Sequence, residues 1–153
     1  MAAASGSEEG RKPSRGGLPF KPDYTAAREM ASRASSYTRR GRDLYVPLDY
    51  TDASIDAADE VGLQLWESLP LGLSRDEAED LRGSLIFELG AYFGETLIRN
   101  HGGQWGWVTM EGRRVFALRT DSGLIAFPLN RARKRLRGEE PDTLDTLYRF
   151  LSR

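Results

Sequence analysis

Cysteine is absent from this 153-residue chain, and histidine occurs once, as His101. The sequence therefore excludes disulfides, thiolate metal sites and a cysteine nucleophile. A site with several histidine ligands is excluded too, and a Ser-His-Asp triad would rest on His101 alone. Because His101 ends a predicted helix, where the helix dipole favours a cation, capping is the favoured interpretation. We predict no metal and no cofactor.

Long hydrophobic runs are also missing. No stretch approaches the roughly 20 apolar residues that a membrane span needs, and the N-terminal MAAASGSEEGRKPSRGG lacks the apolar core of a signal peptide. The absence of cysteine suits a reducing compartment. We therefore expect a cytoplasmic protein without a membrane span.

Charge is balanced overall but uneven along the chain. The net charge is −1, so no global field directs the protein to nucleic acid or membranes. Residues 1–55 carry a net +2, residues 56–100 a net −7 and residues 101–153 a net +4. The acidic and basic parts can attract each other within the fold or present two charged faces, although ordinary solvated helix surfaces are the simpler interpretation.

The longest apolar-periodic segment lies between Ser74 and Gly103 and predicts a long, largely buried helix. Ser74 and Glu77 have the spacing of a capping box, which also explains the acidic cluster that follows, and Gly102 is expected to end the helix. Gly90 and Gly94 each cost about 1 kcal/mol in a helix interior. We therefore expect the preceding helix, predicted over 55–69 with Ser54 as its cap, or a sheet to approach closely there.

After this helix the apolar period changes from 3.6 to 2, which predicts strands over 104–110, 113–119 and 124–128. Two short helices are expected over 131–137 and 142–152. The sequence thus predicts an α+β fold: a helical pair packed on a three-stranded antiparallel meander, followed by two short C-terminal helices.

Residues 1–43 are predicted to be a flexible arm with a short helix, and residues 44–153 a single compact domain. The first 22 residues are rich in Ser, Gly, Pro and charge, so they bury too little surface to offset their ordering entropy. The apolar stripe between residues 23 and 40 is thin, so we expect it not to hold a helix firmly against the domain.

Glu95 is the most interesting carboxylate of the long helix, with Tyr92 one turn before it and Trp107 in the following strand. A pair with Arg99, or a bond to a strand backbone, is the favoured interpretation of Glu95. The tryptophans are expected in the core, with Trp107 nearer its rim. The densest basic cluster lies in the first short helix, with two more arginines at the facing turn. A solvated or internally paired face is favoured over phosphate binding, so the predicted binding surface comprises Tyr92, Glu95, Trp107, Arg113, Arg114, Arg131, Arg133, Lys134 and Arg135.

The last 75 residues or so resemble a loosely defined family of small bacterial domains of unknown function, from genomes of high GC content. The residues that carry the resemblance are Leu89-Gly90-Ala91-Tyr92-Phe93-Gly94-Glu95 and Gly102-Gly103-Gln104-Trp105. The resemblance implies a short sheet, a basic short helix and a final helix after the long helix. It implies no activity.

Three functions stay open on the sequence alone. The favoured hypothesis is a non-enzymatic protein-interaction or regulatory module with an unknown protein partner. The first alternative is a nucleic-acid-associated protein that uses the basic helix and the arginines of the arm. The second alternative is an enzyme or small-ligand binder around Glu95.

Overall fold

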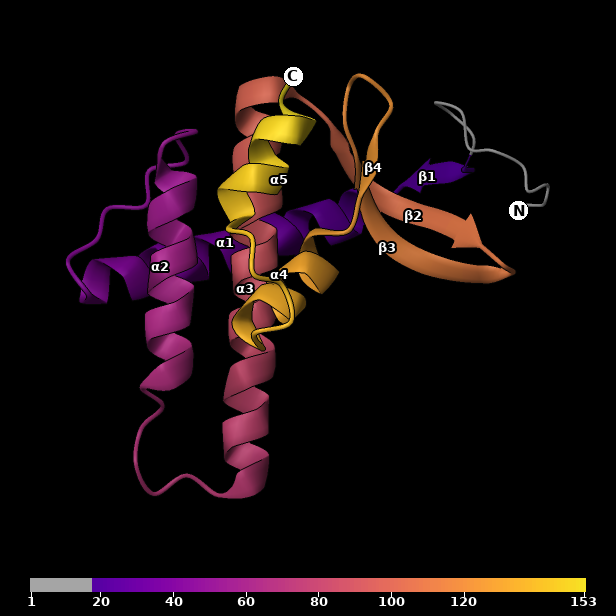
Figure 1. Cartoon of the computed structure of the whole chain (residues 1–153). Helices are drawn as coiled ribbons and strands as arrows, with labels where there is room; N and C mark the ends of the chain where they lie inside the picture. The colour runs from indigo at the N-terminus through magenta and orange to yellow at the C-terminus, as the bar shows by residue number, and fades with distance from the viewer. Residues whose placement is uncertain (1–17) are drawn as a thin grey trace.

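The computed structural model describes residues 18–153. In this part of the chain, the helices pack together beside an antiparallel sheet (Figure 1). The helices are α1 (Tyr24–Asp43), α2 (Ser54–Glu67), α3 (Arg75–His101), α4 (Pro128–Leu136) and α5 (Leu144–Leu151). The strands are β1 (Phe20–Pro22), β2 (Gln104–Met110), β3 (Arg113–Arg119) and β4 (Ile125–Ala126), and they lie in the order β1-β2-β3-β4. The α+β class is confirmed, whereas the three-stranded meander is corrected to a four-stranded sheet by the addition of β1.

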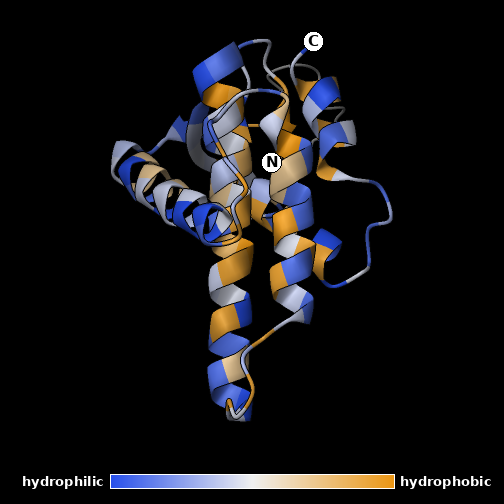
Figure 2. Cartoon of the chain, turned by 90° about the vertical axis from the view of Figure 1, so that its left-hand side faces the viewer, coloured by the Kyte–Doolittle hydropathy of each residue, from blue (hydrophilic) through white to orange (hydrophobic). Residues whose placement is uncertain are grey.

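Helix α3 lies at the centre, packed against α1, α2, α4 and α5. Its N-terminus is the predicted capping box, since the Ser74 Oγ accepts from the Glu77 N–H at 3.1 Å and a Glu77 oxygen accepts from the Ser74 N–H at 2.8 Å. The helix ends before Gly102, whose φ is +83°. Hydrophobic and hydrophilic residues interleave along the helices, as amphipathic packing requires (Figure 2).

Gly90 and Gly94 of α3 allow close packing, as predicted. A Cβ on Gly94 would lie 2.2 Å from a ring carbon of Trp105, so the sheet approaches α3 at this point. A Cβ on Gly90 would lie 2.6 Å from the Leu129 side chain, at the start of α4. The neighbour of Gly90 is therefore α4, which the sequence analysis did not anticipate.

Helix α1 belongs to the packed fold, and the predicted boundary at residue 43 is not where packing begins. Met30 is 2% exposed and Tyr37 is completely buried, with its hydroxyl donating to the Ala58 carbonyl of α2 at 2.6 Å. The Nε of Arg40 donates to Glu88 of α3 at 2.6 Å. The buried residues of α1 recur at helical spacing, at Met30, Ala34, Tyr37 and Gly41, but few of them are large and apolar, so the sequence pattern was thin. Residues 1–17 of the expected arm lie outside the described residues.

Several element ends differ from expectation. Ser54 does not cap α2; its hydroxyl instead donates to the Thr51 carbonyl at 2.7 Å. The third predicted strand shortens to β4 because α4 begins at Pro128, three residues earlier than predicted. Among residues 18–153, no helix is long and apolar enough to cross a membrane.

Candidate functional site

Glu95 supports the packing of the sheet on α3. One of its oxygens accepts from the Trp105 indole N–H at 2.9 Å, and the other lies 3.9 Å from the Nε of Arg99. The Glu95 side chain is 12% exposed. The predicted pair with Arg99 is present, while the strand contact is with an indole rather than with the backbone. Glu95 therefore satisfies a buried donor at the junction of helix and sheet.

Tyr92 is completely buried and holds the segment before α2 in place. Its hydroxyl accepts from the Tyr50 N–H at 2.9 Å and lies 2.6 Å from the Ser54 hydroxyl. The Tyr50 ring stacks on Tyr92 with centroids 4.9 Å apart, and the Arg99 guanidinium covers Tyr50 at 3.6 Å. A buried phenol with these partners has a structural role and no access to a substrate.

Trp107 joins the sheet to the start of α1. Its indole N–H donates to Asp23 at 2.9 Å, and its ring packs edge-on against Phe116. The other carboxylate oxygen of Asp23 caps α1 by accepting from the Ala26 N–H at 2.9 Å. This backbone bond and the indole bond hold the pKa of Asp23 below its ordinary value.

The structure therefore does not combine Tyr92, Glu95 and Trp107 into one site, because each makes its polar contact with a different partner. The described residues also contain no group of three or more His, Cys, Asp or Glu side chains placed to hold a metal ion.

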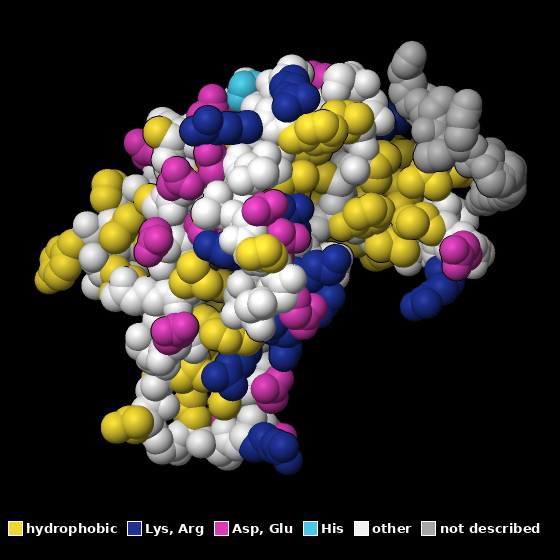
Figure 3. All heavy atoms as spheres, viewed as in Figure 1, with side chains coloured by type: hydrophobic (Ala, Val, Ile, Leu, Met, Phe, Trp, Pro, Cys, Tyr) yellow, Lys and Arg dark blue, Asp and Glu magenta, His cyan; other side chains and the backbone are white. Residues whose placement is uncertain are grey.

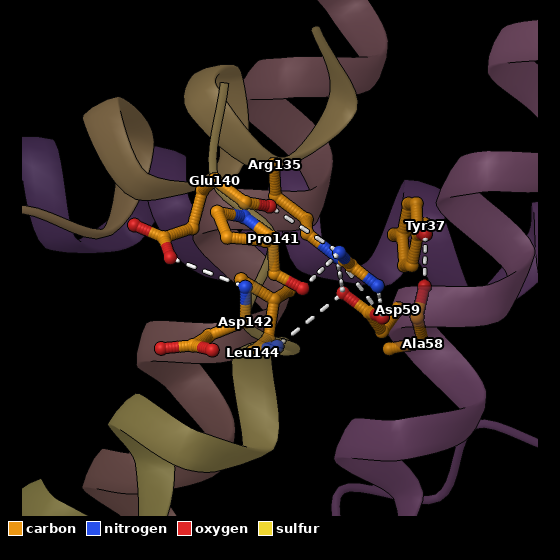
Figure 4. A network of polar contacts seen from close by, with 8 residues as sticks. All are labelled: Tyr37, Ala58, Asp59, Arg135, Glu140, Pro141, Asp142 and Leu144. Carbon is orange, nitrogen blue, oxygen red and sulfur yellow. Dashed lines mark hydrogen bonds and ion pairs between the residues drawn. The ribbon is translucent and has the colours of Figure 1, made fainter. Parts of the chain in front are cut away.

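Arg135 of α4 is an internal connector rather than a surface cation (Figure 4). Its guanidinium donates to both oxygens of Asp59 on α2, at 3.1 Å from Nε and 2.9 Å from Nη2, and to the carbonyl of Pro141 at 3.0 Å. Asp59 is 2% exposed and also accepts from the Leu144 N–H at 3.4 Å. The hydrogen bond to Asp59 raises the pKa of Arg135. One ion pair thus joins α2, α4 and the start of α5.

The other predicted basic residues of α4 divide into two kinds. Arg131 lies 3.8 Å from Glu140, and Arg133 lies 3.6 Å from Glu139. Lys134 is exposed and has no carboxylate within ion-pair distance among the described residues. Internal pairing was one of the two favoured interpretations, and it describes most of the cluster. Fewer of these cations are therefore free to bind nucleic acid.

A cavity of about 240 Å³ lies where β4, α4 and α5 meet, and we call it the α4–α5 pocket. Its apolar walls come mainly from β4 and α5. Its charged rim comes from Arg131 and Lys134 of α4 and from Glu140, which follows α4. At its edge, Phe150 is 47% exposed and Leu124 is 36% exposed. Figure 3 shows apolar side chains gathered on this face, over α5, β4 and the adjoining sheet.

His101 lies in a second polar cluster, at the opposite end of α3 from its capping box. Its Nε2 lies 2.9 Å from an oxygen of Asp52, which also accepts from the Tyr148 hydroxyl of α5. These contacts hold the pKa of Asp52 below its ordinary value, with the bond from Tyr148 as the largest cause. The cluster fastens the loop before α2 to the ends of α3 and α5.

The sequence analysis missed the α4–α5 pocket. The buried stripe of α5 consists of Leu144, Tyr148 and Leu151, and Phe150 falls outside that stripe. Single exposed aromatic residues are common on protein surfaces, so Phe150 alone gave no signal; the site becomes visible only when the fold brings Leu124 and Phe150 to the same edge.

Comparison with known proteins gives no match to a family model, to a curated protein or to a solved structure. The resemblance to a family of bacterial domains therefore stays a prediction.

Proposed function

We propose that this chain is a non-enzymatic protein-interaction module that binds a partner protein through the α4–α5 pocket. The observation that carries the proposal is the cavity itself, which has polar and apolar walls and is bordered by the exposed Phe150 and Leu124. Aromatic residues around a pocket are the usual anchors of protein interfaces.

The size of the cavity favours a side chain of a partner over a free ligand. Small-molecule sites typically occupy about 300–1,000 Å³, and the α4–α5 pocket holds about 240 Å³. One or two apolar side chains, presented by a protein, fit this volume.

The rim of the pocket adds a preference for negative charge. The Nε of Arg131 is buried without a hydrogen-bond acceptor among the described residues, and Lys134 is exposed beside it. That Nε lies 3.8 Å from Glu140, so Lys134, which has no carboxylate within ion-pair distance among the described residues, is the cation that an acidic group of the partner can pair with. The proposed partner therefore presents an apolar side chain next to an acidic one.

The test compares two single variants of the full chain in affinity capture from extracts of the native cells. Phe150→Asp places a charge at the mouth of the pocket, whereas Leu71→Asp places the same charge on a residue that is 99% exposed in the loop before α3. We expect proteins that the wild type and Leu71→Asp retain and that Phe150→Asp loses. Equal retention by all three proteins, or no retained protein, would overturn the proposal; melting curves establish that each variant is folded.

A further inference from the structure

Strand β3 has an open edge on the side of β4. Strand β4 pairs only with Leu118 and Arg119, so residues 113–117 have no strand neighbour on that side within the described residues. The reason lies in the sequence, since Pro128 opens α4 and turns the chain away from the sheet. In Figure 1 the β2–β3 hairpin projects beyond the helices, with this edge of β3 uncovered by another strand.

The backbone groups that point to this edge can be assigned. The Thr120 N–H donates to the Leu124 carbonyl, so Thr120 points toward β4. The backbone N–H and C=O groups of successive residues point to opposite sides of a strand. Those of Leu118, Phe116 and Arg114 therefore point to the same side as those of Thr120. The two-residue turn at 111–112 supports this assignment. Such a turn joins two residues whose backbone groups bond each other between β2 and β3, so the backbone groups of the next residue, Arg114, point away from β2. The N–H and C=O groups of Phe116 and Arg114 therefore face the open edge.

The opposite edge of the sheet is protected. Strand β1 covers part of β2 there, and the Pro19 carbonyl and the Asp23 N–H both bond to β2. By the same alternation, the backbone groups of Phe20 and Pro22 point away from β2, and Pro22 has no N–H to donate. Proline is a usual means of preventing further strand pairing at an edge. Residues 113–117 contain no proline, so the β3 edge offers two donors, the N–H groups of Arg114 and Phe116, whereas the β1 edge offers one, the N–H of Phe20.

Positive charge defines what this edge attracts. Arg113 and Arg114 are exposed and have no carboxylate within ion-pair distance in the described part of the chain. The Arg114 guanidinium lies 4.7 Å from the Trp107 ring centroid, over the face of the sheet. Pairing with a second copy would bring four arginines onto one short ribbon, which like-charge repulsion disfavours. An acidic strand from another protein meets no such repulsion.

We propose that the open edge of β3 binds an extended acidic segment of a partner protein as an added strand in line with β4. This proposal rests on the proposed function and names the form in which the partner binds. Backbone hydrogen bonds to Arg114 and Phe116 would hold the segment, and its apolar side chains would lie toward the α4–α5 pocket, which includes Phe127 at the end of β4. Addition of a strand to a sheet edge is a common mode of peptide recognition.

The test begins with selection of random ten-residue peptides, displayed on phage, against the full chain. We expect the selected peptides to be net acidic and to alternate apolar with polar residues. A synthetic copy of the best peptide is then titrated against Arg114→Pro and Arg114→Ala. Both variants remove the guanidinium, but only proline removes the N–H at the open edge, and the β2–β3 ladder stays intact because Arg114 does not bond to β2. We expect binding to Arg114→Pro to be weaker than to Arg114→Ala by about tenfold, the cost of one lost hydrogen bond.

A second measurement uses the unmodified chain and so does not depend on the folding of a variant. Amide exchange of Phe116 and Arg114 should slow when the selected peptide binds. Equal affinity for the two variants, unchanged exchange, selected peptides that are neutral or basic, or no selected peptide would each overturn the strand proposal. A dimer of the chain that Arg114→Pro dissociates would overturn it in favour of a second copy.

The two proposals fail separately. If Phe150→Asp abolishes peptide binding while Arg114→Pro and Arg114→Ala bind equally, the pocket binds the partner and the edge does not. If Phe150→Asp leaves peptide binding and partner capture unchanged, the proposed function fails whatever happens at the edge.

Discussion

Helix α4 and the β2–β3 hairpin are both rich in arginine, but the two regions use this charge differently. On α4, Arg135 is bonded to the buried Asp59, and Arg131 and Arg133 lie within 4 Å of glutamates. On the hairpin, Arg113 and Arg114 are exposed, and Arg114 covers an indole ring instead of a carboxylate.

The difference follows from what lies opposite each region. Helix α4 packs against α2, which supplies Asp59 to Arg135, and the chain after α4 supplies Glu140 and Glu139 to Arg131 and Arg133. The hairpin instead projects from the helical body (Figure 1). The density of charge along a sequence therefore does not measure the charge that is available to a partner. The sparser pair of arginines on the hairpin is the more available one.

The largest expected effect comes from breaking the internal pair of α4. Asp59→Ala leaves the Arg135 guanidinium, 15% exposed, without its carboxylate and the Leu144 N–H without an acceptor. Removing one partner of a buried ion pair typically costs about 3–5 kcal/mol, and we expect a loss of this size in denaturant unfolding.

Asp56→Ala is the matched control, because Asp56 lies on the same helix and is exposed. It should change the free energy of unfolding by less than about 0.5 kcal/mol. If both variants have the same free energy of unfolding, the Asp59–Arg135 pair adds no measurable stability. The contrast between α4 and the hairpin then disappears.

An intermediate effect is expected where the sheet meets the helical body. In Gly94→Ala the new Cβ would lie 2.2 Å from the Trp105 ring, which must move. Overpacking of this kind costs about 1–3 kcal/mol. The Trp105 bond to Glu95 would lengthen as well, so indole fluorescence should change together with the melting temperature.

Gly83→Ala on the same helix is the control. A Cβ there meets nothing within 4 Å, so the helix propensity of alanine should stabilise the protein by about 1 kcal/mol. Opposite signs for the two substitutions would show that the hairpin is fixed to α3 by close packing. Equal signs would show that the sheet can shift on α3.

The sequence predicted the elements whose signals are local. The capping box at Ser74, the turn at Glu111-Gly112 and the limits of β2 and β3 follow from neighbouring residues, and the structure has them as predicted. The buried position of α1 could not be predicted, because it depends on residues far along the chain, such as Tyr37 with Ala58.

The candidate site shows the same limit. The basic residues of α4 and the hairpin are evident in the sequence, but whether each is paired depends on partners up to 76 positions away, as for Arg135 and Asp59. The open edge of β3 was hidden for a related reason, since the sequence predicted a third strand that continues to residue 128. Only the early start of α4 shortens that strand and leaves the edge uncovered.

The smallest expected effects on stability belong to the hairpin arginines. Arg113→Ala removes an exposed side chain without an ion-pair partner and should change the free energy of unfolding by less than about 0.5 kcal/mol. Arg114→Ala also loses the stack on Trp107, which is worth about 0.5–1 kcal/mol at an exposed site.

Arg133→Ala on α4, whose pair with Glu139 is exposed, provides the comparison at about 0–1 kcal/mol. The Arg133 contribution should fall as salt is added, because it depends on attraction between two exposed charges. Part of the Arg114 contribution should fall as well, because Arg114 helps to lower the pKa of Asp23. A salt-dependent loss for Arg113→Ala in unfolding experiments would reveal an acidic partner within the chain, and the hairpin would then be internally paired like α4.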